Sequence, residues 1–145
     1  MRLRTTTVST DSRGIEFQID PDARLAAAAG GAARYYADAA GLPGEVVAEF
    51  QKSVVAACLE TFQHLNGDHP HLRVSVTHYS DRIEVALTYD GEAAPAVGLD
   101  QIAGFASTLG NSSALGGIDR VQYEARGGTA VTRLTKYLGD ARPTM

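Results

Sequence analysis

Residues 42–67 read LPGEVVAEFQKSVVAACLETFQHLNG, and residues 71–91 read HLRVSVTHYSDRIEVALTYDG. Apolar residues recur in the first stretch at spacings of three and four, which predicts one amphipathic helix from about Glu45 to Leu65. Its apolar stripe consists of Val47, Phe50, Val54, Cys58, Phe62 and Leu65. Apolar and polar residues alternate in the second stretch on both sides of a polar turn, a pattern typical of a β-hairpin. A long helix that leads into a hairpin therefore lies at the centre of the expected fold.

The chain before this helix predicts a hairpin and one more helix. Two short alternating runs within residues 2–19 flank turn residues at positions 11–14, as expected for two antiparallel strands. Asp20 then offers a side-chain acceptor for a helix N-cap, and Pro21 suits the first helical position. This helix is expected to end at Gly41.

Two adjacent glycines, Gly30 and Gly31, interrupt this alanine-rich helix. Each glycine costs about 1 kcal/mol relative to alanine inside a helix. We expect close packing of the helix backbone against another element to be the reason for both.

The last third of the chain predicts a short third helix at about Leu99–Leu109 and a closing hairpin, Ile118–Ala125 with Thr129–Tyr137. The expected fold class is α+β: a two-layer α/β sandwich in which three helices cover one face of a mainly antiparallel or mixed sheet. Residues 1–140 form one domain in this interpretation, and residues 141–145 form a disordered tail.

Composition narrows the classes of protein to which the chain can belong. Its 145 residues carry a net charge of −4 without a basic cluster, so we expect no nucleic-acid partner. The lone Cys58 excludes an internal disulfide and fits a reducing compartment. No apolar run follows the first arginines, and none approaches the ~20 residues of a membrane span. We therefore expect a cytoplasmic protein that does not enter a membrane.

Three segments together resemble the anti-sigma-factor serine kinases of the Bergerat, or histidine-kinase-like, ATPase superfamily. They are residues 42–67, residues 71–95 and the closing GIDRVQYEARGGTAVTRLTKYL at residues 117–138. The resemblance extends over about residues 15–138 and rests on the order of the elements more than on identical motifs. It implies the histidine-kinase-like ATPase fold and a nucleotide site for ATP with Mg²⁺.

The helix motif of that family is Glu-x-x-x-Asn-x-x-x-His, in which the carboxylate activates a hydroxyl and the amide oxygen holds magnesium. Aligning His64 with the family histidine places Glu60 at the asparagine and Ala56 at the glutamate. Alanine has no proton acceptor, so the general base is lost and no catalytic residue is assigned. Glu60 keeps a carboxylate that suits a hard cation and is the one metal ligand that the resemblance implies.

The family aspartate that binds the adenine amino group belongs to an Asp-x-Gly loop after the hairpin. Strand alternation places Tyr89 at that position and retains Gly91, whereas a slip of one residue would offer Asp90. Gly98 is the best match to the phosphate-binding glycine segment because a helix follows it, and the alternative is Gly116-Gly117. The nucleotide-binding candidates are therefore Glu60, His64, Tyr89, Asp90, Gly91 and Gly98.

Most of these features also have a plainer explanation. Glu60 and His64 fit the solvated side of an amphipathic helix, and Asp90 with Gly91 fits an ordinary turn. The spacing of the histidines at residues 64–71 matches no zinc site, so a turn with surface histidines is expected. Tyr35 and Tyr36 suggest an apolar surface for a partner, although packing against the sheet also accounts for that helix.

Function follows from the resemblance. It implies a transcription regulator that binds a sigma factor or an anti-sigma antagonist by partner switching, with a degenerate nucleotide site. The alternative is an ATP-binding serine protein kinase that phosphorylates the antagonist. A third interpretation is an α+β domain of unrelated ancestry. Family members commonly dimerise, so the resemblance also suggests a homodimer.

Overall fold

The computed structural model describes residues 2–9, 12–65, 67–90 and 116–138. For residues 2–9 only the backbone and its strand pairing are described. The helices and strands in chain order are β1 (Arg2–Ser9), β2 (Ser12–Ile19), α1 (Ala23–Ala39), α2 (Gly44–Phe62), β3 (Leu72–His78), β4 (Arg82–Asp90), β5 (Arg120–Arg126) and β6 (Thr129–Tyr137). The predicted helix around residues 99–109, together with Gly91, Gly98 and the tail at 141–145, lies outside the described residues.

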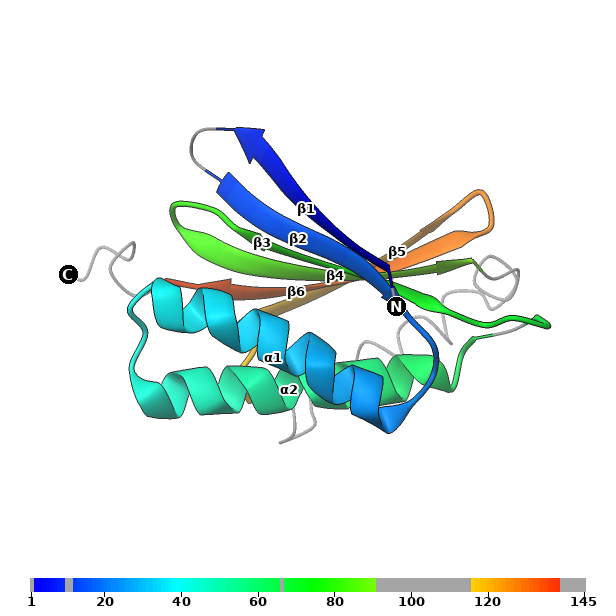
Figure 1. Ribbon diagram of the computed structural model, residues 1–145, viewed down its shortest axis with the longest axis horizontal. Helices are drawn as coiled ribbons and strands as arrows, with labels where there is room; N and C mark the ends of the chain where they lie inside the picture. Colours follow the sequence, from blue (N-terminus) through cyan, green and yellow to red (C-terminus); the bar gives the residue numbers. More distant parts are fainter. Residues whose placement is uncertain (1, 10–11, 66, 91–115, 139–145) are drawn as a thin grey trace.

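The strands form one six-stranded sheet in the order β1-β2-β3-β4-β6-β5, and every pairing between neighbours is antiparallel. Helices α1 and α2 lie side by side on one face of this sheet (Figure 1). The predicted α+β class and the three predicted hairpins are therefore confirmed. The described residues contain two of the three predicted helices.

The core lies between the helix pair and the covered face of the sheet. Alternate residues of each central strand point into it, because successive side chains of a strand point to opposite faces. The largest fully buried side chains are Phe50, Ile19, Leu72, Ile83, Leu87, Leu134, Val47, Val54, Val74, Val76, Val85 and Thr61. The apolar stripe predicted for the second helix therefore faces the sheet through most of its length.

Both helices differ from the sequence prediction at one end. Helix α1 begins at Ala23, and its N-cap is Asp22, not Asp20. The Asp22 carboxylate accepts the backbone N–H of Arg24 at 2.8 Å, which satisfies a donor that the first turn leaves free. Helix α2 ends at Phe62, and the chain continues to Leu65 in tighter turns with bonds between residues three apart.

The two adjacent glycines of α1 have different surroundings. A Cβ built on Gly30 would lie 2.5 Å from Cγ2 of Val55 and 3.2 Å from the carbonyl oxygen of Gln51, both on α2. A Cβ on Gly31 would meet nothing within 4 Å. Close packing therefore explains Gly30, and the prediction that it also explains Gly31 is wrong.

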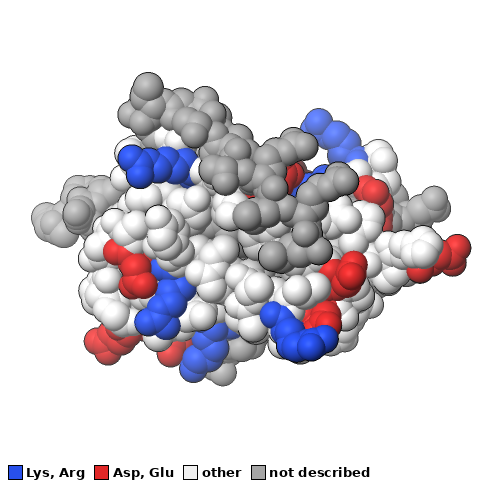
Figure 2. Space-filling model, viewed as in Figure 1, with Lys and Arg blue, Asp and Glu red and all other residues white. Residues whose placement is uncertain are grey.

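Charged side chains occur in small groups of both signs on the face that Figure 2 shows, not as one basic or acidic field. Most of the described ion pairs join residues no more than four positions apart in the chain, such as Arg34 with Asp38 and Lys52 with Glu49, both at 3.6 Å. Exposed pairs of this kind contribute little to stability. Neither described helix is long and apolar enough to span a membrane.

Cys58 lies fully buried on the sheet side of α2, and burial raises the pKa of its thiol to about 12. The thiolate is the reactive form, so the native protein should resist a thiol-specific alkylating reagent at mildly alkaline pH. The same reagent should label the protein rapidly and once per chain in denaturant. Mass spectrometry of the two samples checks this, and rapid labelling of the native chain would show that Cys58 is not buried.

Candidate functional site

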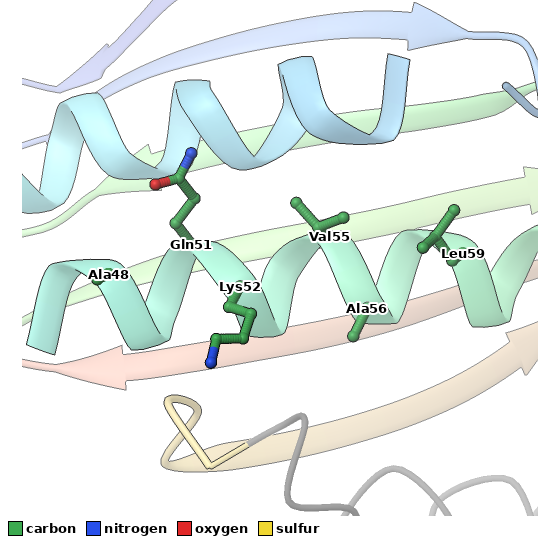
Figure 3. Close-up of a pocket in the computed structure, with 6 residues that line it drawn as sticks. All are labelled: Ala48, Gln51, Lys52, Val55, Ala56 and Leu59. Carbon is green, nitrogen blue, oxygen red and sulfur yellow. The ribbon is translucent and has the colours of Figure 1, made fainter. Parts of the chain in front are cut away.

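A shallow groove of about 440 Å³ runs along the outward face of α2 (Figure 3). It is lined by Ala48, Gln51, Lys52, Val55, Ala56 and Leu59. Val55, Leu59 and Gln51 point toward α1, whereas Lys52 and Ala56 point to the opposite side of the groove. The lining is mainly apolar, and Leu59 is 41% exposed, one of the most exposed large apolar side chains that the structure describes.

Ala56 lies in this groove at the position where the resemblance would place a general base. A methyl group cannot accept a proton, and the groove-lining side chains include no carboxylate or imidazole. The groove therefore offers mainly apolar contact, and Lys52 is the one titratable side chain among its described lining residues.

Glu60 lies one helical turn beyond Ala56, and His64 lies in the turn after α2. The structure brings these two predicted site residues together: the distance between His64 Nε2 and Glu60 Oε2 is 4.0 Å, and both side chains are half-exposed. A carboxylate in this position is open to solvent and to a cation. Among the described residues, no three His, Cys, Asp or Glu side chains gather closely enough to hold a metal ion. A magnesium ion at Glu60 would therefore depend on ligands from nucleotide phosphates or water.

Tyr89 faces the core and Asp90 faces away from it, as strand alternation predicted. Tyr89 is opposite Ala130 on β6 and only 7% exposed, whereas Asp90 is exposed and accepts a hydrogen bond from the Thr129 hydroxyl at 3.5 Å. Burial raises the pKa of Tyr89 well above its usual range, and the nearby Tyr123 hydroxyl, which is hydrogen-bonded to it, adds to the shift. This position, where the resemblance would place a carboxylate, therefore holds a neutral phenol that already has a hydrogen-bond partner.

This arrangement does not fit the adenine contact that the family makes. The resemblance would place a carboxylate for the adenine amino group at the position of Tyr89, on the covered face of the sheet, and Asp90 lies on the other face. Thr132 Oγ1, two residues from Ala130 on the same face, has no hydrogen-bond partner among the described residues, but Thr132 is fully buried. It presents no open surface to a ligand.

The turn at Gly116-Gly117 is the described candidate for a phosphate-binding segment. Gly117 is packed directly on α2: a Cβ there would lie 2.5 Å from the carbonyl carbon and oxygen of Glu49 and 2.6 Å from the backbone nitrogen of Phe50. Its N–H donates to the Ser53 hydroxyl at 3.0 Å. Because this donor is used inside the fold, it is not available to a phosphate oxygen.

A second hollow, of about 430 Å³, lies between this turn and the first two turns of α2. Its lining includes two carboxylates, Glu45 and Glu49, and one cation, Lys136. The Lys136 ammonium lies 3.4 Å from the Asp119 carboxylate. Carboxylates beside a partly neutralised lysine disfavour a polyphosphate, so this hollow does not fit the nucleotide either.

Sequence reasoning missed the contact between Gly117 and Ser53. The sequence did contain a sign of this contact, because Ser53 is a polar residue on the predicted buried side of a helix that is mainly apolar there. Buried hydroxyls in proteins are nearly always hydrogen-bonded, so a partner was to be expected. The helix pattern alone does not show that this partner comes from the start of the closing hairpin, 64 residues away.

Comparison with known proteins supplies no family for the chain. No protein-family model matches the sequence, and no curated protein matches it significantly.

Proposed function

We propose that this chain is a regulatory domain that acts by binding a protein partner, in the manner of anti-sigma factors, with a degenerate nucleotide site. The observation that carries the proposal is Ala56 in the apolar groove of α2, at the position where a kinase of this kind needs its base. Two features outside α2 support it: Tyr89 on β4 is buried, and the N–H of Gly117 is already hydrogen-bonded to Ser53.

The histidine-kinase-like ATPase fold is part of this proposal. Its support is the order of the elements: a strand pair, two helices on one face, a central hairpin and a closing hairpin whose last strand, β6, lies between β4 and β5. A fold hosts many functions, so the argument for function rests on the replaced side chains.

The partner class also comes from the resemblance. A sigma factor or an anti-sigma antagonist would bind the domain in the cytoplasm, and a homodimer is the proposed assembly. Binding would regulate transcription without phosphoryl transfer, because Ala56 stands where the resemblance requires a carboxylate base.

Thermal unfolding with and without ATP and Mg²⁺ tests the proposal. A ligand present at about 100 times its Kd stabilises a protein by about 2.7 kcal/mol, which moves the Tm of a domain of this size by several degrees. We expect no shift for the wild-type chain with MgATP beyond that with Mg²⁺ alone. A clear MgATP-dependent rise in Tm would contradict the claim that the site is degenerate.

The ATP-binding serine kinase is the second candidate, and the half-exposed Glu60 beside His64 favours it. In that case Glu60→Ala should abolish the MgATP-dependent rise in Tm, because it removes the magnesium ligand. Gln63→Ala is the matched control, since Gln63 is a neighbour at the end of the same helix that lacks a carboxylate.

A further inference from the structure

Four side chains from three elements gather at the C-terminal end of α1, and we call them the α1-end cluster. They are Arg13 of β2, Tyr35 and Tyr36 of α1, and His78 of β3. Arg13 and His78 are directly opposite in the β2–β3 ladder, on the face that the helices cover. In Figure 1 the C-terminal end of α1 lies at the same end of the molecule as the β3–β4 turn.

The rings of the cluster are in contact. The centroids of Tyr35 and Tyr36 lie 5.1 Å apart with an interplanar angle of 85°, and those of Tyr36 and His78 lie 6.4 Å apart at 69°. Such edge-to-face contacts hold aromatic rings in a defined orientation. Tyr36 is half-buried, whereas Tyr35 is 67% exposed, the highest value among the large apolar side chains that the structure describes.

Arg13 is an exposed cation at the edge of these rings. The arginines that form ion pairs with described carboxylates are Arg24, Arg34, Arg73, Arg82 and Arg133. Arg13 forms none within the described ranges. Its charge acts on Tyr36, where it opposes the rise in pKa that burial causes.

We propose that the α1-end cluster docks an acidic segment of a partner protein, in which a carboxylate pairs with Arg13 and an adjacent apolar side chain covers Tyr35. Charge complementarity identifies the occupant, because the cluster presents a guanidinium that forms no ion pair with a described carboxylate. Tyrosine and arginine are among the residue types that most often contribute a large share of the binding energy at protein interfaces. The surface goes beyond the proposed function and does not depend on whether nucleotide binds.

The test is a titration of the full-length ¹⁵N-labelled chain with a synthetic peptide of alternating aspartate and leucine, followed by heteronuclear NMR. We expect the largest shift changes at the amides of Arg13, Tyr35, Tyr36 and His78. Arg13→Gln and Tyr35→Ala should each weaken binding about tenfold, the loss typical of a central interface residue. Both side chains are exposed, so Arg13→Gln should leave the Tm unchanged, and Tyr35→Ala, which loses the edge contact with Tyr36, should lower it only slightly.

The matched control is Arg120→Gln on β5. Arg120 is also exposed and forms no ion pair with a described carboxylate. It lies on β5, the strand at the opposite edge of the sheet from β1 and β2. An equal loss of affinity in Arg120→Gln would reveal general charge attraction and overturn the proposal. Shifts centred on the α2 groove, equal binding of a lysine–leucine peptide, or no binding of the acidic peptide would also overturn it.

Discussion

Gly117→Ala is expected to destabilise the fold by about 3 kcal/mol or more, the upper part of the range for an overpacked core. The added methyl group would meet backbone atoms of α2 at 2.5–2.6 Å, a distance that real Cβ atoms essentially never show. Backbone in the middle of a packed helix cannot move aside as a flexible side chain can. The hydrogen bond from Gly117 to Ser53 would be lost in the same displacement. Urea unfolding monitored by circular dichroism measures the change.

Gly44→Ala is the control for this variant. Gly44 begins α2, and a Cβ there would meet nothing within 4 Å. Its replacement should leave the free energy of unfolding unchanged or raise it slightly, because alanine favours the helix. Equal stability of the Gly117→Ala and Gly44→Ala proteins would show that the closing hairpin does not begin against α2.

The second large effect is that alanine substitutions at two adjacent positions of α1 should change the free energy of unfolding in opposite directions. Gly30→Ala should lower the free energy of unfolding by about 1–3 kcal/mol, because the new methyl group would overlap Val55 Cγ2. Gly31→Ala should raise it by about 0.5–1 kcal/mol, because alanine is the better helix former and this side of the helix is open. Denaturant unfolding of the two single variants measures both changes.

A double-mutant cycle identifies the contact responsible. Val55→Ala removes the atom nearest to the methyl group that Gly30→Ala adds, so Gly30→Ala should cost clearly less in the Val55→Ala background. The carbonyl of Gln51, at 3.2 Å, remains and should keep part of the cost. An unchanged cost in that background, or destabilisation by Gly31→Ala, would contradict the packing of α1 on α2.

The elements that could be predicted from the sequence are those whose local pattern and tertiary environment agree. Alternation in residues 71–91 predicted the β3–β4 hairpin and the direction of Tyr89, because one face of the sheet is buried and a register slip would expose every core side chain. The spacing of apolar residues predicted α2, because the face on which they recur is the face that packs on the sheet. At the start of α1, two aspartates compete within three residues, and Asp22 is the one whose carboxylate reaches the N–H of Arg24.

The candidate site was less predictable, because it depends on contacts between elements far apart in the chain. The spacing of Ala56, Glu60 and His64 is a local property of a helix, and the structure keeps Glu60 and His64 adjacent. The side chains that line the groove around Ala56 all belong to α2, whereas the contact of Gly117 with α2 arises only when the closing hairpin packs against that helix. No pattern within one element contains that information.

Isothermal titration of the wild-type chain with ATP in the presence of Mg²⁺ tests the central claim most directly. Our account predicts no binding heat beyond that of dilution, because the buried Tyr89 and the internally bonded Gly117 replace or withdraw groups that would contact a nucleotide. Saturable, magnesium-dependent binding with a Kd in the micromolar range that is lost in Glu60→Ala would contradict it and favour the kinase.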